Sequence, residues 1–130
     1  MEKQKVAVII GASGQDGSYL SEYLISLGYK VYGMVRRNSI PEHQESRLHH
    51  LQDKLITVYG DVTDFGSIVN LLEMAMPDEI YNLSAQSHVR ISFDIPHFTA
   101  QTNSIGVLNI LEATKKVCRD AKIVIVNYIL

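Results

Sequence analysis

Short apolar runs alternate with longer amphipathic stretches along this chain. Five of the runs are rich in β-branched residues and predict strands at 6–10, 30–35, 55–59, 79–83 and 122–126. The first run, VAVII, contains no polar position. Such a run is typical of a strand that is buried on both faces of a parallel sheet.

The stretches between these runs carry apolar residues at the i, i+3, i+4 and i+7 spacing of a helix that buries one face. Gly28 is expected to end the first helix and Asp64 to cap the second. The third helix is expected to follow Pro96. The positions expected to be buried are Leu20, Tyr23, Leu24 and Leu27 in the first helix, Ile68, Leu71, Leu72 and Ala75 in the second, and Val107, Ile110, Leu111, Thr114 and Val117 in the third.

The region between the second and third runs gives a weaker pattern. Residues 41–54 offer only Leu48 and Leu51 for burial, so we expect no more than a short helix there. The alternation of strand and helix otherwise predicts an α/β fold with a doubly wound parallel sheet of about five strands. We find no internal repeat, linker or low-complexity segment, so residues 1–130 are interpreted as one domain.

Ligands of a doubly wound sheet lie beyond the carboxyl ends of its strands. The chemistry is therefore expected in the loops 11–17, 36–40, 61–64 and 84–90, each of which follows a predicted strand.

Composition narrows the class of protein further. The 130 residues are 46% hydrophobic and 20% charged, with a formal net charge of −2, which favours a globular domain and gives no basic surplus for nucleic acid. Cys118 is the only cysteine and the five histidines lack zinc-ligand spacing, so no metal site is expected. The apolar run near the N-terminus is too short for a signal peptide or a membrane span, which predicts a cytoplasmic protein with no membrane partner.

Three glycines spaced three apart follow the first predicted strand, in the sequence GASGQDG. Gly11 would make a tight turn, Gly14 would let the backbone approach a pyrophosphate, and Gly17 would let the helix pack closely on the strand. The spacing differs from G-x-G-x-x-G, and no Gly-Lys-Ser/Thr follows, which argues against an ATP-type phosphate loop. The alternative is a glycine turn without a ligand. The position of the three glycines, between the first strand and the first helix, favours a Rossmann-type dinucleotide site over that alternative.

The ends of the second and third strands bear on which dinucleotide is bound. Arg36 and Arg37 occupy the place where NAD-binding proteins usually have an acid, and two guanidinium groups there suit the 2′-phosphate of NADP. The alternative is that these arginines only face solvent. After the third strand, Asp61 could accept a hydrogen bond from the adenine amino group with Val62 beside the ring, or Asp61 could simply form a turn.

Longer motifs point to a family. GASGQDGSYL, the Arg-Arg pair, GDVTD, PDEIYNLSAQSHVRISF and GVLNILEA together resemble the nucleotide-sugar 4,6-dehydratases of the extended short-chain dehydrogenase/reductase family, above all those that act on GDP-mannose. The resemblance covers essentially the whole chain. It implies hydride transfer from C4 of the mannose to NADP+, loss of water across C5 and C6, and return of the hydride at C6 to give a 4-keto-6-deoxy sugar.

The resemblance also implies roles for individual residues. Those expected at the cofactor are Gly11, Ser13, Gly14, Gln15, Asp16 and Gly17 at the pyrophosphate, Arg36 and Arg37 at the 2′-phosphate, Asp61 and Val62 at the adenine, and Leu83, Ser84, Ala85, Gln86 and Ser87 at the nicotinamide-side ribose. Those expected nearest the sugar nucleotide are Ser87, His88 and Arg90. From the residues alone, His88 is interpreted as a structural hydrogen-bonding group rather than a catalytic one, and Arg90 could contact phosphate or water. For the full-length family the resemblance implies a homo-oligomer.

The chain departs from the family pattern in several places. Residues 96–100, PHFTA, lack a tyrosine hydroxyl that the family has there, and residues 101–103, QTN, replace an Asp-rich segment. No tyrosine is followed four residues later by a lysine, so the family's Tyr-x-x-x-Lys base is absent from this sequence. We therefore expect a C-terminally truncated chain without catalytic residues, in effect the cofactor half of a dehydratase. The alternatives are a nucleotide-sugar epimerase or reductase, and a dinucleotide-binding module without catalysis.

Overall fold

The computed structural model describes residues 3–36, 48–51, 53–84 and 96–126, with side-chain surroundings from residue 104 onward in the last segment. In this part of the chain, five parallel strands form one sheet in the order β3-β2-β1-β4-β5. The strands are β1 (Val6–Ile10), β2 (Lys30–Val35), β3 (Leu55–Tyr59), β4 (Glu79–Asn82) and β5 (Lys122–Ile125). All five predicted strands are confirmed, the last two being one residue shorter than expected.

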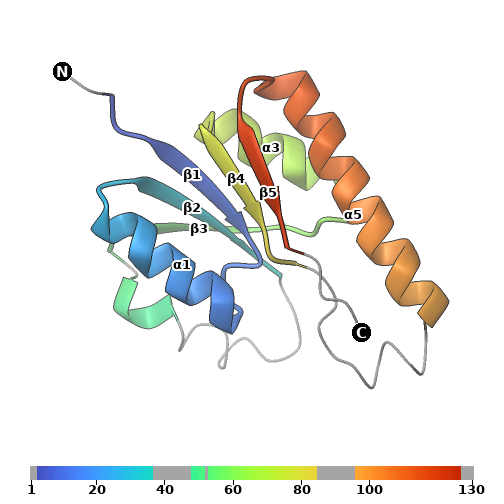
Figure 1. The fold of residues 1–130 in the computed structure, drawn as a ribbon, viewed down its shortest axis with the longest axis horizontal. Helices are drawn as coiled ribbons and strands as arrows, with labels where there is room; N and C mark the ends of the chain where they lie inside the picture. The colour runs from blue at the N-terminus through green and yellow to red at the C-terminus, as the bar shows by residue number, and fades with distance from the viewer. Residues whose placement is uncertain (1–2, 37–47, 52, 85–95, 127–130) are drawn as a thin grey trace.

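Helices cover both faces of the sheet, as Figure 1 shows. Helix α1 (Gln15–Ser26) lies on one face, and α3 (Phe65–Ala75) and α5 (Pro96–Val117) lie on the other. The side chains of β1 divide accordingly, because Ala7 and Ile9 join the core beneath α1 whereas Val8 and Ile10 join the core beneath α3 and α5. The predicted doubly wound α/β architecture is therefore confirmed.

Helix α1 packs on the sheet through small residues. Gly17, Ser18, Ser21 and Leu24 are buried, whereas Tyr23 and Leu27 are 59% and 55% exposed. The predicted buried face, which included Tyr23 and Leu27, is wrong at these two positions. The reason is the close approach of the helix to the strands, which leaves room for glycine and serine but not for large side chains. The buried Ser21 hydroxyl donates to the Gly17 carbonyl at 2.7 Å, so it leaves no unpaired polar group.

Gly28 ends α1 as predicted. It follows the C-cap residue Leu27 with a φ of +90°, which favours glycine. The Gly28 N–H donates to the Ile25 carbonyl at 3.0 Å, and the Tyr29 N–H donates to the Leu24 carbonyl at 3.0 Å. These two bonds form a Schellman motif that satisfies carbonyls at the end of the helix.

Helix α3 agrees with its prediction throughout. Its four predicted buried residues are buried, and the Asp64 side chain caps the helix by accepting a hydrogen bond from the Gly66 N–H at 3.1 Å. Between β2 and β3, the short 3-10 helix His49–Leu51 follows Leu48, and both Leu48 and Leu51 are buried as expected.

The buried positions of helix α5 differ in part from those predicted. Ile110 and Thr114 are buried as expected, but Leu111 is 45% exposed and Ala113 is fully buried instead. As in α1, a small residue occupies the close contact and a large one faces outward. Within the described residues, no helix combines the length and apolar character that crossing a membrane requires.

Candidate functional site

The carboxyl ends of three neighbouring strands meet at the glycine turn that follows β1 (Figure 1). The N–H groups of Gly11 and Ala12 both donate to the Met34 carbonyl in β2, at 3.0 and 3.2 Å. On the other side, the Leu83 N–H donates to the Ile10 carbonyl at 2.8 Å, which ties the segment after β4 to the end of β1. The chain reverses its winding direction at β1, between β2 and β4, and this is the position at which doubly wound sheets bind ligands.

Gly11 is required by the geometry of the turn. Its φ is +88°, in the left-handed region that favours glycine. A Cβ on Gly11 would also lie 2.9 Å from the carbonyl carbon and oxygen of Leu83. The predicted role of Gly11 in a tight turn is confirmed, and the turn is packed directly against the segment after β4.

Gly17 is required by packing. A Cβ at this position would lie 2.2 Å from the Gly11 carbonyl oxygen and 2.8 Å from the Ala12 Cα. No side chain can occupy that space without moving the backbone of the turn. The predicted role of Gly17 in close packing of helix against strand is therefore confirmed.

Gly14 differs from the other two glycines. It is the N-cap of α1, with a φ of −71° that any residue can adopt. A Cβ there would have only the Gly11 carbonyl oxygen nearby, at an ordinary 3.6 Å. Nothing in the described part of the chain requires a glycine at this position, and no side chain caps the helix from it.

The first turn of α1 begins at this point. Gln15 and Asp16 are exposed, whereas Ser13 is 8% exposed and lies within the turn. The first N–H groups of a helix have no carbonyl partner within the helix, and the helix dipole adds partial positive charge. The turn therefore presents backbone donors and a bare Cα toward the carboxyl edge of the sheet, an arrangement that suits an anion such as a pyrophosphate.

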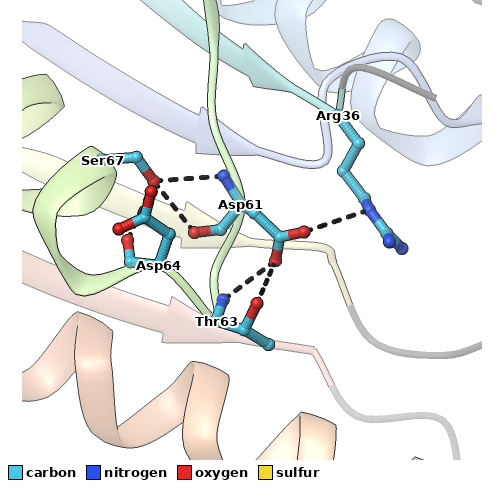
Figure 2. A network of polar contacts seen from close by, with 5 residues as sticks. All are labelled: Arg36, Asp61, Thr63, Asp64 and Ser67. Atoms are coloured by element: carbon cyan, nitrogen blue, oxygen red, sulfur yellow. Dashed lines mark hydrogen bonds and ion pairs between the residues drawn. The ribbon is translucent and has the colours of Figure 1, made fainter.

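A polar network after β3 fixes the position of Asp61 (Figure 2). Its Oδ1 atom accepts hydrogen bonds from the Thr63 N–H at 2.9 Å and the Thr63 hydroxyl at 2.8 Å. The Ser67 hydroxyl accepts from the Asp61 N–H at 3.1 Å and donates to the Asp61 carbonyl at 3.0 Å. Asp61 therefore forms a turn, as one of the two interpretations of this residue proposed.

The second carboxylate oxygen of Asp61 faces β2. Oδ2 lies 3.6 Å from Nε of Arg36, whose side chain is 66% exposed. Partial burial alone would raise the pKa of Asp61, but the two hydrogen bonds from Thr63 and the charge of Arg36 outweigh it and lower the pKa. Asp61 is thus an ionised acceptor at the same edge of the sheet as the glycine turn.

The residues after β4 approach the turn from the other side. Asn82 is buried, and its Oδ1 accepts hydrogen bonds from the N–H and the hydroxyl of Ser84. Leu83 and Ser84 are held in this way beside Gly11. The structure therefore brings together the glycine turn after β1 and the first residues after β4, at the edge of the sheet where both loops were expected.

Several predicted site residues lie outside the described part of the chain, namely Arg37, Ala85, Gln86, Ser87, His88 and Arg90. Their predicted roles stay predictions. Among the described residues, no group of three or more histidine, cysteine, aspartate or glutamate side chains could hold a metal ion.

One residue of the site was missed by sequence reasoning. Asn109 of α5 donates from Nδ2 to the Val62 carbonyl at 2.7 Å, although the two residues are 47 positions apart. The available signal was a polar residue among the apolar positions of GVLNILEA, three residues after the buried Gly106.

Comparison with known proteins agrees with this geometry. The family model for GDP-mannose 4,6 dehydratase matches residues 8–127. GDP-mannose 4,6 dehydratase 2 of Caenorhabditis elegans is 44% identical over 120 residues, which cover 85% of this chain and 31% of that protein. This chain thus spans about a third of the length of the curated relatives it matches.

Solved structures support the fold. The structure of Pen from Bacillus thuringiensis superposes with a TM-score of 0.80 at 22% identity, covering 95% of this chain and 37% of that chain. The Bordetella bronchiseptica enzyme WbmH, solved in complex with NAD+, has a TM-score of 0.68 at 27% identity, covering 88% and 36%. The family match extends from β1 to the end of β5 and includes the glycine turn and the Asp61 loop, so this chain belongs to the GDP-mannose 4,6-dehydratase family.

Proposed function

We propose that residues 1–130 form the NADP-binding domain of a GDP-mannose 4,6-dehydratase. The observation that carries this proposal is the contrast among the three glycines of the turn. Gly11 and Gly17 are required by the chain's own geometry, whereas Gly14 has room for a methyl group and a φ that does not need glycine. A ligand that approaches the backbone there explains why the position lacks a side chain.

The proposed cofactor contacts follow the carboxyl edge of the sheet. The turn from Gly11 to Gly17, with Ser13, Gln15 and Asp16, would hold the pyrophosphate at the start of α1. Asp61 and Val62 would hold the adenine. Leu83 and Ser84 would adjoin the ribose on the nicotinamide side, and we extend this role to Ala85, Gln86 and Ser87 on the basis of the family resemblance alone.

The preference for NADP over NAD is part of the proposal. The exposed Arg36 lies at the end of β2, where an acid would bind the ribose hydroxyls of NAD. A guanidinium group at this position can bind a phosphate with two parallel hydrogen bonds. We propose that Arg36, together with Arg37, binds the 2′-phosphate.

The bound NADP+ would supply a hydride acceptor that is restored at the end of each cycle. The chain's residues would hold it, and Ser87, His88 and Arg90 would lie nearest the nucleotide sugar. The sequence contains no Tyr-x-x-x-Lys pair to take the proton from the sugar's 4-hydroxyl. A positioned base of this kind typically contributes about 10² to 10⁴ in rate. We therefore propose that the 130 residues by themselves bind cofactor without dehydrating GDP-mannose.

Two measurements test this function. Calorimetric titration of the 130-residue chain should show binding of NADP and weaker binding of NAD. The protein at its native length should convert GDP-mannose to a 4-keto-6-deoxy product without net accumulation of NADPH. Formation of this product by rigorously purified 130-residue chain would contradict the proposal that these residues bind the cofactor but do not catalyse the dehydration.

The runner-up function is a nucleotide-sugar epimerase or reductase. Incubation with GDP-mannose and with UDP-glucose, followed by mass spectrometry of the products, separates the two functions. Loss of water from GDP-mannose supports the dehydratase, whereas an isomer of unchanged mass supports the epimerase. We also propose a cytoplasmic homo-oligomer, as the resemblance implies, which cell fractionation and sedimentation velocity would test.

A further inference from the structure

Helix α5 contacts the loop after β3 through a partly buried hydrogen bond. Asn109 donates from Nδ2 to the Val62 carbonyl at 2.7 Å. Val62 is 8% exposed and belongs to the core between the sheet and α5. A hydrogen bond that joins two elements in such surroundings restrains the orientation of the carbonyl that accepts it.

Gly106 brings α5 close to the same residue. A Cβ on Gly106 would lie 2.9 Å from Val62 Cγ2 and 3.1 Å from Val62 Cβ, both tighter than ordinary contact. The helix therefore fixes Val62 at two points, because Asn109 holds its carbonyl and the bare Cα of Gly106 accommodates its side chain.

The Val62 carbonyl and the Thr63 N–H belong to one peptide group. That N–H donates to Oδ1 of Asp61 at 2.9 Å. Because a peptide group is planar, the direction of the carbonyl determines the direction of the N–H on its opposite side. The bond from Asn109 to this carbonyl thus also orients the N–H that holds the Asp61 carboxylate. The Thr63 hydroxyl, which donates to the same Oδ1 at 2.8 Å, further limits the rotation of that carboxylate.

We propose that Asn109 is a positioning residue that acts through the Val62–Thr63 peptide to aim the Asp61 carboxylate at the adenine of the bound dinucleotide, and so sets selectivity for that base. This inference rests on the proposed function, since it requires the dinucleotide to bind with its adenine at Asp61. Asn109 itself need not touch the cofactor.

The test compares NADP with nicotinamide hypoxanthine dinucleotide phosphate, which carries a carbonyl in place of the adenine amino group. A hydrogen bond to a charged acceptor contributes roughly 1.5–3 kcal/mol, so the protein at its native length should prefer NADP by about tenfold or more. Asn109→Ala should reduce this preference to about threefold or less, mainly by weakening NADP. Asn70→Ala, which removes an exposed asparagine from α3, should leave the preference unchanged.

Gly106→Ala serves as the second variant if Asn109→Ala does not fold. Its added methyl group displaces the side chain of Val62 and so disturbs the peptide that Asn109 holds. It should reduce the base preference in the same direction. Asn109→Asp retains the shape but replaces the amide donor by a carboxylate, so it should reduce the preference as Asn109→Ala does. Equal weakening of both dinucleotides in these variants would indicate a merely structural role and overturn the inference.

The outcomes separate this inference from the proposed function. If the parent binds NADP with a clear preference and the variants keep it, Asn109 does not position Asp61 and only the inference fails. A parent that binds both dinucleotides equally also overturns the inference, because Asp61 then does not read the amino group. If the parent binds neither, the proposed function fails and the inference fails with it.

Discussion

Arg36 Nε lies 3.6 Å from Asp61 Oδ2, which links the ends of β2 and β3 beside the glycine turn. Both side chains are partly exposed, and ion pairs of this kind contribute only about 0–1 kcal/mol to stability. The pair therefore adds little to the stability of the fold, and in the proposed function both residues contact the cofactor. Figure 2 shows the terminal guanidinium nitrogens of Arg36 on the side away from Asp61, where they are available to a phosphate.

Replacement of Arg36 tests the preference for NADP. Arg36→Ala should weaken NADP binding by about ten- to a hundredfold, because a hydrogen bond to a charged group contributes roughly 1.5–3 kcal/mol. NAD binding should barely change, since NAD has no 2′-phosphate. Titration calorimetry with both dinucleotides measures the two effects.

Arg119→Ala provides the matched control, because Arg119 is an exposed arginine after the end of α5, at the amino edge of the sheet. It should bind both dinucleotides as the parent does. Equal losses for NADP and NAD in Arg36→Ala would show that Arg36 does not read the 2′-phosphate.

Strands β1 and β2 were predictable because their pattern follows from burial alone. A strand such as β1, covered on both faces, must be apolar at nearly every position, and this leaves a continuous run that the sequence displays directly. Helix α3 was predictable for a related reason, since its buried positions are large and its cap is an aspartate.

The buried faces of α1 and α5 were harder to predict. Where a helix approaches its neighbour closely, glycine, alanine and serine take the contact, and large apolar residues such as Tyr23 and Leu111 are left exposed. Hydrophobicity then no longer marks the inner face.

In the site, the roles of Gly11 and Gly17 could be predicted from their spacing. Asn109 could not, because its partner lies 47 residues away and only the fold brings them together.

A contact between two residues of β4, Tyr81 and Glu79, predicts how the stability of the protein depends on pH. The Tyr81 hydroxyl donates to Oε1 of Glu79 at 2.9 Å. Burial, followed by this hydrogen bond and the charge of Glu79, raises the pKa of Tyr81 to about 12, from an ordinary value of 10.0. Because the folded state holds the proton more tightly, this contribution to stability is complete below about pH 10 and is lost as the pH rises through about 12.

Urea denaturation across this pH range measures the effect. The free energy of unfolding of the parent should fall more steeply than that of Tyr81→Phe, which cannot ionise. Both proteins in this comparison also carry Tyr29→Phe, because Tyr29 interacts with Glu79 and with Tyr81 and its titration would not cancel. Parallel curves would show that the folded state does not raise the pKa of Tyr81.

The exposed edge strand β5 leads us to predict that the 130-residue chain associates with itself. It is an edge strand among the described strands, and Val124 is 44% exposed on it. An exposed apolar edge strand offers unpaired backbone groups to a second chain. Sedimentation velocity should show association that increases with concentration, and Val124→Lys should reduce it. Met74→Lys, at an exposed apolar position on α3, should not. A parent chain that stays monomeric would contradict this prediction.

Gly14→Ala separates binding from folding. The added methyl group has room within the chain, so the free energy of unfolding should change by no more than about 1 kcal/mol. Gly17→Ala is the contrasting variant, because its Cβ would lie 2.2 Å from the Gly11 carbonyl oxygen. It should destabilise the protein by about 1–3 kcal/mol or more.

Calorimetric titration of NADP into the parent chain and into folded Gly14→Ala tests the central claim most directly. We predict that the parent binds NADP and that Gly14→Ala, with its fold intact by circular dichroism and thermal denaturation, shows no measurable binding. Binding of NADP to Gly14→Ala with the affinity of the parent would show that the glycine turn does not hold a dinucleotide.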